Sequence, residues 1–266
     1  MMLNLDSISV TFNPGTALEV AALRGVSLAI PEGQFVTVIG SNGAGKSTLL
    51  SAVAGAVAPD RGRIVIDGVD VTRLPTRARA RFIGRVFQDP RIGTCEALTV
   101  EENLALASAR AGRRGLSLAL GGRIGRARFK DQLADLGLGL ETKLAARIGT
   151  LSGGQRQAVS LLMATLLPMK LLLLDEHTAA LDPKAASRIL ALSAEISERQ
   201  RLTTLMVTHS MRHALDYGQR IIMMNGGRIV LDVAGDERAG YDVPDLVALF
   251  GAVSGGEVAE DPLLLA

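Results

Sequence analysis

Gly40-Ser41-Asn42-Gly43-Ala44-Gly45-Lys46-Ser47-Thr48 is the stretch of this sequence that decides the fold. The apolar, β-branched run 33–39 comes directly before it and is predicted to form a buried strand. The run 47–54, which follows the loop, is compatible with a helix and ends at Gly55. A strand, a loop of the pattern G-x-x-x-x-G-K-S and a helix, in that order, predict a phosphate-binding loop in an α/β protein.

Each residue type in this loop has a physical task. Glycines allow successive backbone N–H groups to face a phosphate, and the helix N-terminus adds a partial positive charge. Lys46 is predicted to bridge the β- and γ-phosphates of ATP, and the Ser47 hydroxyl to coordinate Mg²⁺. The alternative is a glycine-rich turn that contains Lys-Ser by chance, on the order of one in a hundred for a chain of average composition.

Three further apolar runs, 82–87, 171–174 and 203–207, end in polar residues. Ligands of open α/β sheets bind at the carboxyl ends of the strands, so these ends are expected to meet at the phosphate loop. Each polar residue taken alone fits a solvated turn or a surface position equally well. The residues in question are Gln88, then Asp175 and Glu176, and then His209 after Thr208.

Taken together with the loop, these residues have predicted roles in ATP hydrolysis. Asp175 is expected beside the Mg²⁺ ion, and Glu176 is expected to activate the attacking water as general base. His209 is predicted to contact the γ-phosphate and the water. Gln88 is predicted to offer its amide oxygen to Mg²⁺ or to water. Catalytic roles therefore fall to Glu176, His209 and Gln88, and the predicted metal ligands are Ser47, Gln88 and Asp175.

A second candidate phosphate site is Leu151-Ser152-Gly153-Gly154-Gln155, which lacks a lysine. Ser152 and Gln155 fit a capping box for the apolar run 156–167, which Pro168 is expected to end. The alternative is an ordinary well-capped core helix. The two glycines cost helix stability and allow close approach to the backbone, so we interpret the motif as a γ-phosphate cradle. Because one nucleotide does not need two helix N-termini, the cradle predicts a head-to-tail dimer.

In this combination the sequence resembles the ATP-binding subunit of an ABC transporter, over roughly residues 3 to 250. The resemblance identifies residues 40–48 as Walker A, 151–155 as the signature and 171–175 as Walker B, with Gln88 in the Q-loop and His209 as the switch histidine. It implies a P-loop (RecA-like) α/β core, an N-terminal antiparallel β subdomain and a helical insertion between Q-loop and signature. It also implies that two subunits sandwich two ATP molecules.

The resemblance extends to two further nucleotide-binding residues and shows two departures. Phe12 falls where the family places an aromatic that stacks on adenine, although a core Phe is the alternative reading. The D-loop ends at Asp182, which we count among the nucleotide-binding residues. His177 and Ala179 stand where the family usually has Pro and Ser. His177 is either a neutral variation or a protonatable group beside the site.

Family-based boundaries divide the chain into one ABC ATPase domain, 1–250, and a flexible tail, 251–266. Within the domain, 1–88 and 153–250 are expected to form the core, and 89–152 the helical subdomain. Residues 89–150, which include a capped helix start at Thr99, are expected to receive a membrane permease. A second ATP-binding subunit, identical or paralogous, and an extracytoplasmic substrate-binding protein complete the expected partners.

Composition supports this class of protein. Hydrophobic residues make up 48% of the chain, enough for a sizeable core, and the single cysteine, Cys95, excludes an internal disulfide. No signal peptide is recognisable, and the apolar stretch 161–174 is too short to span a bilayer. A net charge of +2 gives no support for nucleic-acid binding. We therefore expect a peripheral protein at the cytoplasmic face of the inner membrane.

One segment, residues 110–130, is strongly basic. It contains no acidic residue, and it is read either as a solvated face or as a contact for anionic headgroups or the permease. Its basic residues are Arg110, Arg113, Arg114, Arg123, Arg126, Arg128 and Lys130.

The predicted function is an ATPase that energises a permease, in a bacterial importer of amino acids or similar small solutes. The stretch Asp175-Glu176-His177-Thr178-Ala179-Ala180-Leu181-Asp182-Pro183 looks like a subgroup with members linked to aromatic amino acid uptake. Two alternatives stay open at this point. One is a soluble ABC ATPase that drives a cytoplasmic assembly or biogenesis complex, and the other is the ATPase of an exporter.

Overall fold

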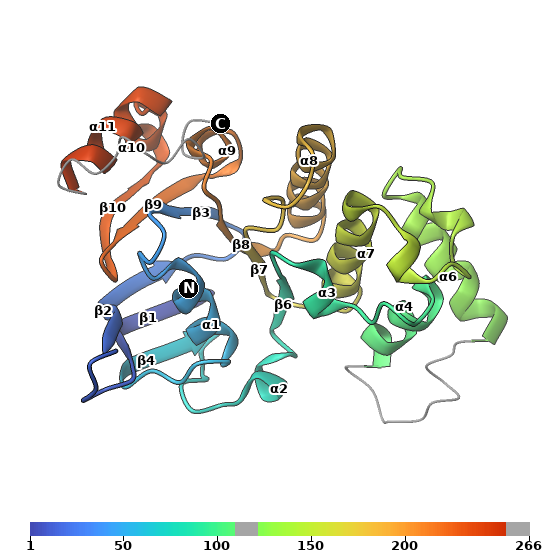
Figure 1. Cartoon of the computed structure of the whole chain (residues 1–266), viewed down its shortest axis with the longest axis horizontal. Coiled ribbons are helices and arrows are strands. Elements are labelled where there is room, and N and C mark those ends of the chain that lie inside the picture. The colour runs from blue at the N-terminus through green and yellow to red at the C-terminus, as the bar shows by residue number, and fades with distance from the viewer. Residues whose placement is uncertain (110–121, 254–266) are drawn as a thin grey trace.

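The computed structural model describes residues 1–109 and 122–253, and in that part of the chain the strands form two sheets (Figure 1). The smaller sheet is antiparallel and has the order β2-β1-β4-β5. Its strands are β1 (Leu3–Phe12), β2 (Val20–Ile30), β4 (Arg61–Ile66) and β5 (Val69–Asp70). This sheet corresponds to the antiparallel β subdomain that the sequence predicts.

The larger sheet has the order β10-β9-β3-β8-β7-β6. Strands β9, β3, β8, β7 and β6 run parallel to their neighbours, and β10 is antiparallel to β9. The predicted strand runs are confirmed, and Gly226 and Gly227 form the hairpin turn between β9 and β10. The strands are β3 (Phe35–Gly40), β6 (Ile83–Val86), β7 (Leu171–Asp175), β8 (Thr203–Val207), β9 (Arg220–Asn225) and β10 (Arg228–Ala234).

Alternation along β7 explains how this sheet is buried on both faces. Leu171 and Leu173 belong to a core cluster with α1 (Lys46–Ala54) and the smaller sheet. Leu172 and Leu174 belong to a second cluster with α7 (Gly153–Thr165) and α8 (Pro183–Arg199). All four leucines are 0% exposed, and burying such a side chain contributes about 1.5–3 kcal/mol. The continuous apolar run is therefore the signature of a parallel strand covered on both sides.

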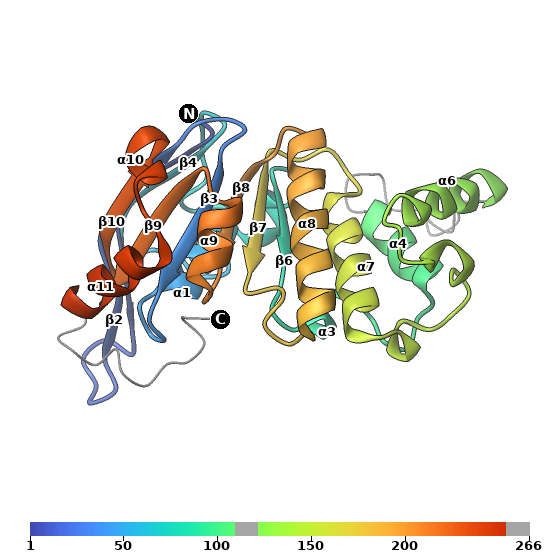
Figure 2. The ribbon, with the colours of Figure 1, turned by 90° about the horizontal axis from the view of Figure 1, so that it is seen from above.

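Short helices join the sheet to a helical region that lies beyond β6 and α8 (Figures 1 and 2). Thr99 and Glu102 form a capping box at the start of α4, as the sequence predicts. The helical segments there are α3 (Pro90–Gly93), α4 (Val100–Ser108), α6 (Gly122–Ala134), the 3₁₀ turns η2 (Leu140–Thr142) and η3 (Ile148–Thr150), and α7.

The remaining helices are α2 (Thr76–Arg79), α9 (Met211–Tyr217), α10 (Gly235–Ala239) and α11 (Val243–Val253). Two predicted ends are corrected. Helix α7 ends at Thr165, before Pro168, and α11 continues to Val253, beyond the residue 251 at which the tail was expected to begin. Residues 254–266 of that expected tail, and residues 110–121 of the basic segment, lie outside the described residues. Within the described ranges, no helix combines the length and apolar character that crossing a bilayer requires.

Candidate functional site

The glycine loop lies between the end of β3 and the start of α1, and its shape requires glycine at both ends. Gly40 has φ 149°, and a Cβ there would lie 2.2 Å from the carbonyl oxygen of Met224. Gly45 has φ 101°, and a Cβ there would lie 2.4 Å from the carbonyl oxygen of Ala22. Gly43 also has a positive φ, of 78°, but a Cβ there would meet nothing within 4 Å. Packing thus fixes the two ends of the loop and leaves its middle open.

Lys46 opens α1 and is 4% exposed. Its Nζ donates hydrogen bonds to the carbonyl oxygens of Gly40 at 2.8 Å and Ser41 at 2.9 Å. It also lies 4.0 Å from Oε1 of Glu176. A charged donor is therefore held over the loop, next to the predicted general base, where an anion in the loop can replace the two carbonyls as its partner.

Asp175 ends β7 beside the first turn of α1. The Ser47 hydroxyl donates to its Oδ1 at 3.2 Å, and the Arg85 guanidinium donates to its Oδ2 at 2.8 Å. A hydroxyl and a carboxylate side by side are hard oxygen ligands of the type that Mg²⁺ prefers. The donor set therefore fits the predicted metal, with Ser47 and Asp175 as the adjacent oxygens. Within the described residues there is no cluster of three or more His, Cys, Asp and Glu side chains that resembles a separate metal site.

Glu176 follows Asp175 with φ 45°, a left-handed conformation that is rare for a non-glycine residue. His209 Nε2 lies 2.6 Å from its Oε2. Burial raises the pKa of Glu176, but the hydrogen bond and charge of His209 and the charge of Lys46 outweigh burial, so the pKa is lowered overall. The carboxylate is thus ionised at neutral pH and able to accept a proton.

The three predicted catalytic residues share one cavity. Gln88, Glu176 and His209 line a space of about 470 Å³, together with Thr208 and residues at the start of α8 and α9. They come from the ends of three different strands, as the sequence predicts for an open α/β sheet. Of these three residues, Gln88 makes no hydrogen bond to Asp175 or Glu176.

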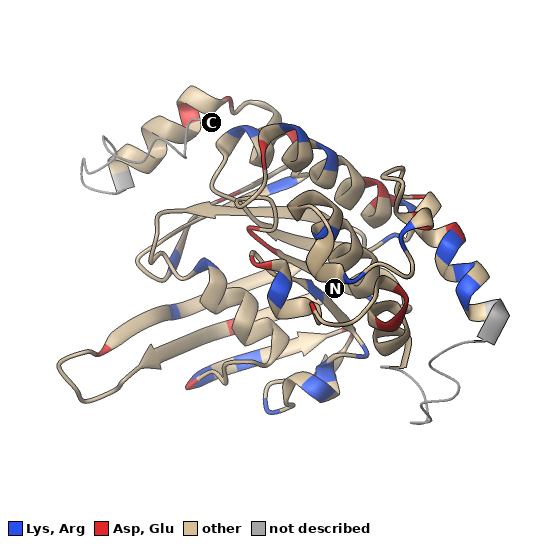
Figure 3. Cartoon of the chain, turned by 45° about the vertical axis from the view of Figure 1, so that its right-hand side comes forward, with Lys and Arg blue, Asp and Glu red and all other residues tan. Residues whose placement is uncertain are grey.

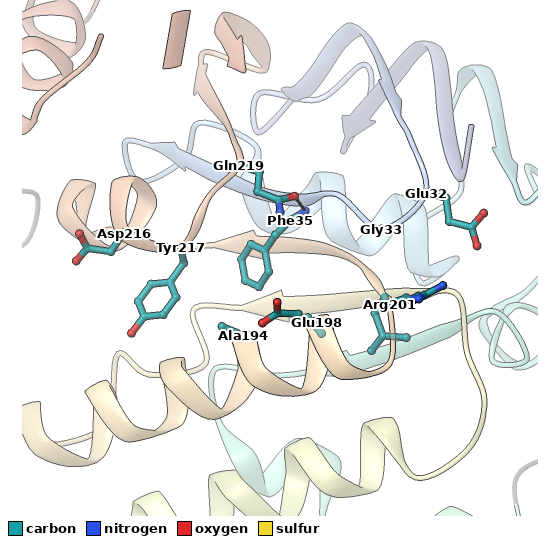
Figure 4. A pocket seen from close by; sticks show the side chains of 11 residues that line it. Glu32, Gly33, Phe35, Ala194, Glu198, Arg201, Asp216, Tyr217 and Gln219 are labelled. Atoms are coloured by element: carbon teal, nitrogen blue, oxygen red, sulfur yellow. Dashed lines mark hydrogen bonds between the residues drawn. The ribbon is translucent and has the colours of Figure 1, made fainter. Parts of the chain in front are cut away.

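A larger cavity, of about 740 Å³, lies at the amino ends of β3, β8 and β9 (Figure 4). Phe35 at the start of β3 and Glu198 on α8 line it, and none of the predicted site residues does. Figure 4 shows the carboxylates of Glu32 and Asp216 directed away from its centre. Size alone therefore does not mark the candidate site, because the predicted catalytic residues line the smaller cavity at the carboxyl ends.

The signature motif forms the predicted capping box. The Ser152 hydroxyl accepts from the Gln155 backbone N–H at 3.3 Å, and Gln155 Oε1 accepts from the Ser152 N–H at 3.4 Å. The glycines have a packing reason that the sequence did not disclose: a Cβ on Gly153 would lie 3.2 Å from Leu181 Cδ2, and one on Gly154 3.0 Å from Ala185 Cβ. Their presence therefore does not by itself require a ligand. Figures 1 and 2 both show α7 apart from α1, with strands β6 and β7 between them.

Two outlying site predictions have clear positions. Phe12 is the last residue of β1 and is 40% exposed, opposite Val20 on β2. The alternative of a core Phe is therefore wrong, and stacking on a base stays a prediction. Asp182 is the N-cap of α8, and its carboxylate accepts from the Ala185 backbone N–H at 3.0 Å. Its carboxylate has a structural use already, and a role toward the nucleotide stays a prediction.

His177, one of the two departures from the family pattern, is 2% exposed. Its Nε2 lies 2.9 Å from the Ser193 hydroxyl on α8. Burial, reinforced by the nearby His213, lowers the pKa of His177 to about 3. Of the two alternatives for this residue, a protonatable group beside the site is therefore wrong at physiological pH, and His177 is a neutral packing residue.

Two arginines of this region were missed by the sequence-based reasoning. Arg85 lies within the apolar run 82–87. Because a charged residue is rarely buried unless it is paired, its place in a predicted buried strand was an available signal of a partner. Arg79 is 1% exposed, and its guanidinium donates to the carbonyls of Ala52 and Val53 at 2.7 and 2.8 Å, at the end of α1. No sequence motif indicated that contact. In the basic segment, Arg126 on α6 lies 3.6 Å from Glu101, and Figure 3 shows basic residues along α6 at the edge of the molecule.

Comparison with protein families and known proteins places this geometry in context. Residues 23–179 match the family model described as ABC transporter. The chain is 40% identical over 254 residues to a tyrosine transport ATP-binding protein of Clostridioides difficile strain R20291, covering 94% of this chain and 98% of that protein. It is 36% identical over 270 residues to a phosphonates import ATP-binding protein, PhnC, of Chromohalobacter salexigens, covering 98% and 93%.

Solved structures of ATP-binding cassettes are also similar to this chain. A dimeric ATP-binding cassette, MJ0796, in a post-hydrolysis state bound to ADP and Pi, matches with a TM-score of 0.75 and 30% identity, covering 88% of this chain and 98% of that chain. The ADP conformation of MJ1267, a cassette of an ABC transporter, matches with a TM-score of 0.75 and 26% identity, covering 97% and 99%.

Proposed function

The chain belongs to the ABC transporter family as an ATP-binding domain, and on that basis we propose that it is the ATPase subunit of a bacterial importer of amino acids or similar small solutes. The relatives named for tyrosine transport and phosphonates import support an importer over an exporter or a cytoplasmic assembly ATPase. The match to the tyrosine transport protein along nearly the whole chain supports an amino acid as the solute.

The observation that carries the catalytic proposal is the position of Glu176. Its carboxylate lies between Lys46, at 4.0 Å, and His209, at 2.6 Å, in the cavity that Gln88 also lines. In this proposal the loop 40–48 and Lys46 hold the phosphates, and Glu176 accepts the proton of the attacking water. His209 orients the carboxylate and contacts the γ-phosphate.

A divalent cation completes this proposal. Mg²⁺, held by Ser47, Gln88 and Asp175, would neutralise phosphate charge. The side-by-side oxygens of Ser47 and Asp175 support the first and third ligands directly. Gln88 is proposed as a ligand on its place in the cavity alone.

The signature is proposed to serve the nucleotide of a second chain. Ser152 is exposed at the N-terminus of α7, which lies away from the glycine loop of its own chain. Head-to-tail pairing would bring Ser152, Gly153, Gly154 and Gln155 to the partner's γ-phosphate, with Asp182 and Phe12 as further contacts. The dimeric cassette of known structure, bound to ADP and Pi, supports the pairing of two chains.

Domain boundaries and outer partners complete the proposal. Residues 1–88 and 153–250 form the catalytic core, and 89–152 form a helical subdomain that meets a membrane permease through residues 89–150. The complex lies at the cytoplasmic face of the inner membrane and works with an extracytoplasmic substrate-binding protein. Purification from detergent-solubilised membranes is expected to recover a multi-spanning permease. A reconstituted complex whose ATPase rate does not respond to amino acids would contradict the proposed solute.

The decisive experiment uses the Glu176→Gln variant, which is expected to bind ATP but to lose roughly 10²–10³ in turnover. Size-exclusion chromatography with light scattering is expected to show a monomer without nucleotide and a dimer with Mg-ATP. Adding Ser152→Asp provides a matched control, because Asp is a good N-cap but places a negative charge against the phosphate. That double variant should bind ATP and stay monomeric. Dimerisation that survives Ser152→Asp would contradict the signature's role.

A further inference from the structure

Arg85 is a charged residue in the middle of a buried strand, and its contacts link three elements of the proposed ATP site. It lies on β6, and its side chain is 16% exposed. Its guanidinium donates to Oδ2 of Asp175 on β7 at 2.8 Å and approaches the Ser51 hydroxyl on α1 at 3.4 Å. The guanidinium carbon also lies 4.7 Å from the centre of the Phe87 ring.

The carboxylate that Arg85 contacts is the one proposed to hold the divalent cation. Both Asp175 oxygens are engaged: Ser47 donates to Oδ1 and Arg85 to Oδ2. The Asp175 side chain is only 12% exposed, so solvent screens this pair weakly. A full positive charge therefore already neutralises the carboxylate before any cation arrives.

From this contact we infer that Arg85 is a positioning residue that sets how strongly the site holds its divalent cation. The inference rests on the proposed ATP site. Arg85 occupies one oxygen of Asp175 and places a second positive charge beside the cation, so it lowers the affinity of the site for the cation. The same contact connects Asp175 to β6, the strand that leads into Gln88. In the absence of the cation, the same contact keeps Asp175 next to Ser47.

Two opposite effects of removing Arg85 must be weighed. Loss of the guanidinium frees the Asp175 side chain to rotate, which weakens cation binding, but aspartate has few rotatable bonds and Ser47 still holds Oδ1. Loss of the charge removes a repulsion acting on a divalent ion and restores the full charge of the carboxylate. At distances of a few ångströms and low exposure, the charge effect is the larger one. We therefore expect tighter cation binding without Arg85.

The test measures ATP binding by calorimetry in the full-length Glu176→Gln chain, in EDTA and at stepped free Mg²⁺ concentrations. Arg85→Met is the informative variant. Methionine keeps the length of the side chain and its packing on Phe87, and it removes a buried Nε for which no acceptor exists among the described residues. The Mg²⁺ concentration at half-saturation should fall roughly threefold to tenfold.

Three further measurements keep the inference falsifiable. Arg85→Lys retains the charge, so its Mg²⁺ concentration at half-saturation should stay close to that of the parent chain. A purely structural role for the planar guanidinium does not predict this result. Asp175→Asn should raise the Mg²⁺ concentration at half-saturation, and adding Arg85→Met to it should then lower that concentration by a smaller factor than in the parent chain, because only the direct repulsion between Arg85 and the cation is left to remove. An unchanged or higher Mg²⁺ requirement in Arg85→Met, with ATP still bound, overturns the inference. A parent chain that binds no ATP contradicts the proposed function instead.

Discussion

The buried His177 makes a quantitative prediction about the pH dependence of folding. Ser193 uses its own hydroxyl proton in a 2.8 Å hydrogen bond to the Ile189 carbonyl, so His177 Nε2, at 2.9 Å, must be the donor in their contact. In a neutral imidazole this corresponds to the tautomer with the proton on Nε2. Burial lowers the pKa of His177 to about 3, from an ordinary value of 6.5, and the charge of His213 adds to the effect.

The sign of the effect follows from proton binding. Below pH 6.5 the unfolded chain protonates His177 and the folded chain does not, so the contribution to stability is complete above pH 6.5 and is lost as the pH falls toward 3. Between pH 7.5 and 5.5 the free energy of unfolding should fall by about 1.3 kcal/mol from this residue alone. The result hardly depends on the folded-state pKa, because pH 5.5 is well above it.

The perturbation is His177→Gln, which keeps an N–H donor within reach of Ser193 but does not titrate. Urea unfolding at the two pH values, followed by circular dichroism because the chain has no Trp, should show the wild type losing about 1.3 kcal/mol more than the variant. His213→Gln is the matched control: burial also lowers the pKa of His213, but this residue is less buried, so its effect should be smaller. Equal pH dependence of wild type and His177→Gln would refute the argument.

Three other changes have expected outcomes. Lys46→Ala removes the charged donor over the glycine loop and should raise the ATP dissociation constant roughly tenfold to hundredfold, measured by calorimetry; unchanged affinity would contradict the loop assignment. Arg79→Met leaves the carbonyls of Ala52 and Val53 without their charged donor and should lower the free energy of unfolding by about 2–4 kcal/mol in urea titration. A loss below 0.5 kcal/mol, the range of neutral surface changes, would show that this contact does not stabilise α1. Phe12→Ala should weaken ATP binding by about 1 kcal/mol but leave binding of inorganic triphosphate unchanged, and equal losses for both ligands would argue against stacking on adenine.

The sheet and the main phosphate loop were predictable because they depend on local patterns. The leucine run of β7, the glycine spacing of the loop and the two capping boxes each carry their signal within a few neighbouring residues. The meeting of Gln88, Glu176 and His209 followed from the rule that parallel strands place their carboxyl ends together. These parts needed no knowledge of long-range packing.

Residues whose partners are distant in the sequence could not be predicted in the same way. Arg79 meets the end of α1, and Arg85 meets Asp175, through contacts that only the assembled sheet creates. The glycines of the signature had two physical reasons, and the sequence alone could not show that Leu181 and Ala185 pack against them. The burial of His177 was equally hidden, because a polar residue after a strand is usually exposed.

The hydrogen bonds of Lys46 bear on the thermodynamics of the proposed cycle. Since its ammonium group already donates to the Gly40 and Ser41 carbonyls, an arriving phosphate exchanges one set of charge-assisted bonds for another. The enthalpy gained at Lys46 is therefore the difference between its hydrogen bonds to the phosphate and its hydrogen bonds to the two carbonyls. This difference is smaller than the number of Lys46–phosphate contacts alone would suggest. When the phosphate departs, the carbonyls accept the lysine again, so release does not leave a desolvated charge behind. Such an exchange favours rapid turnover of nucleotide over tight retention of it.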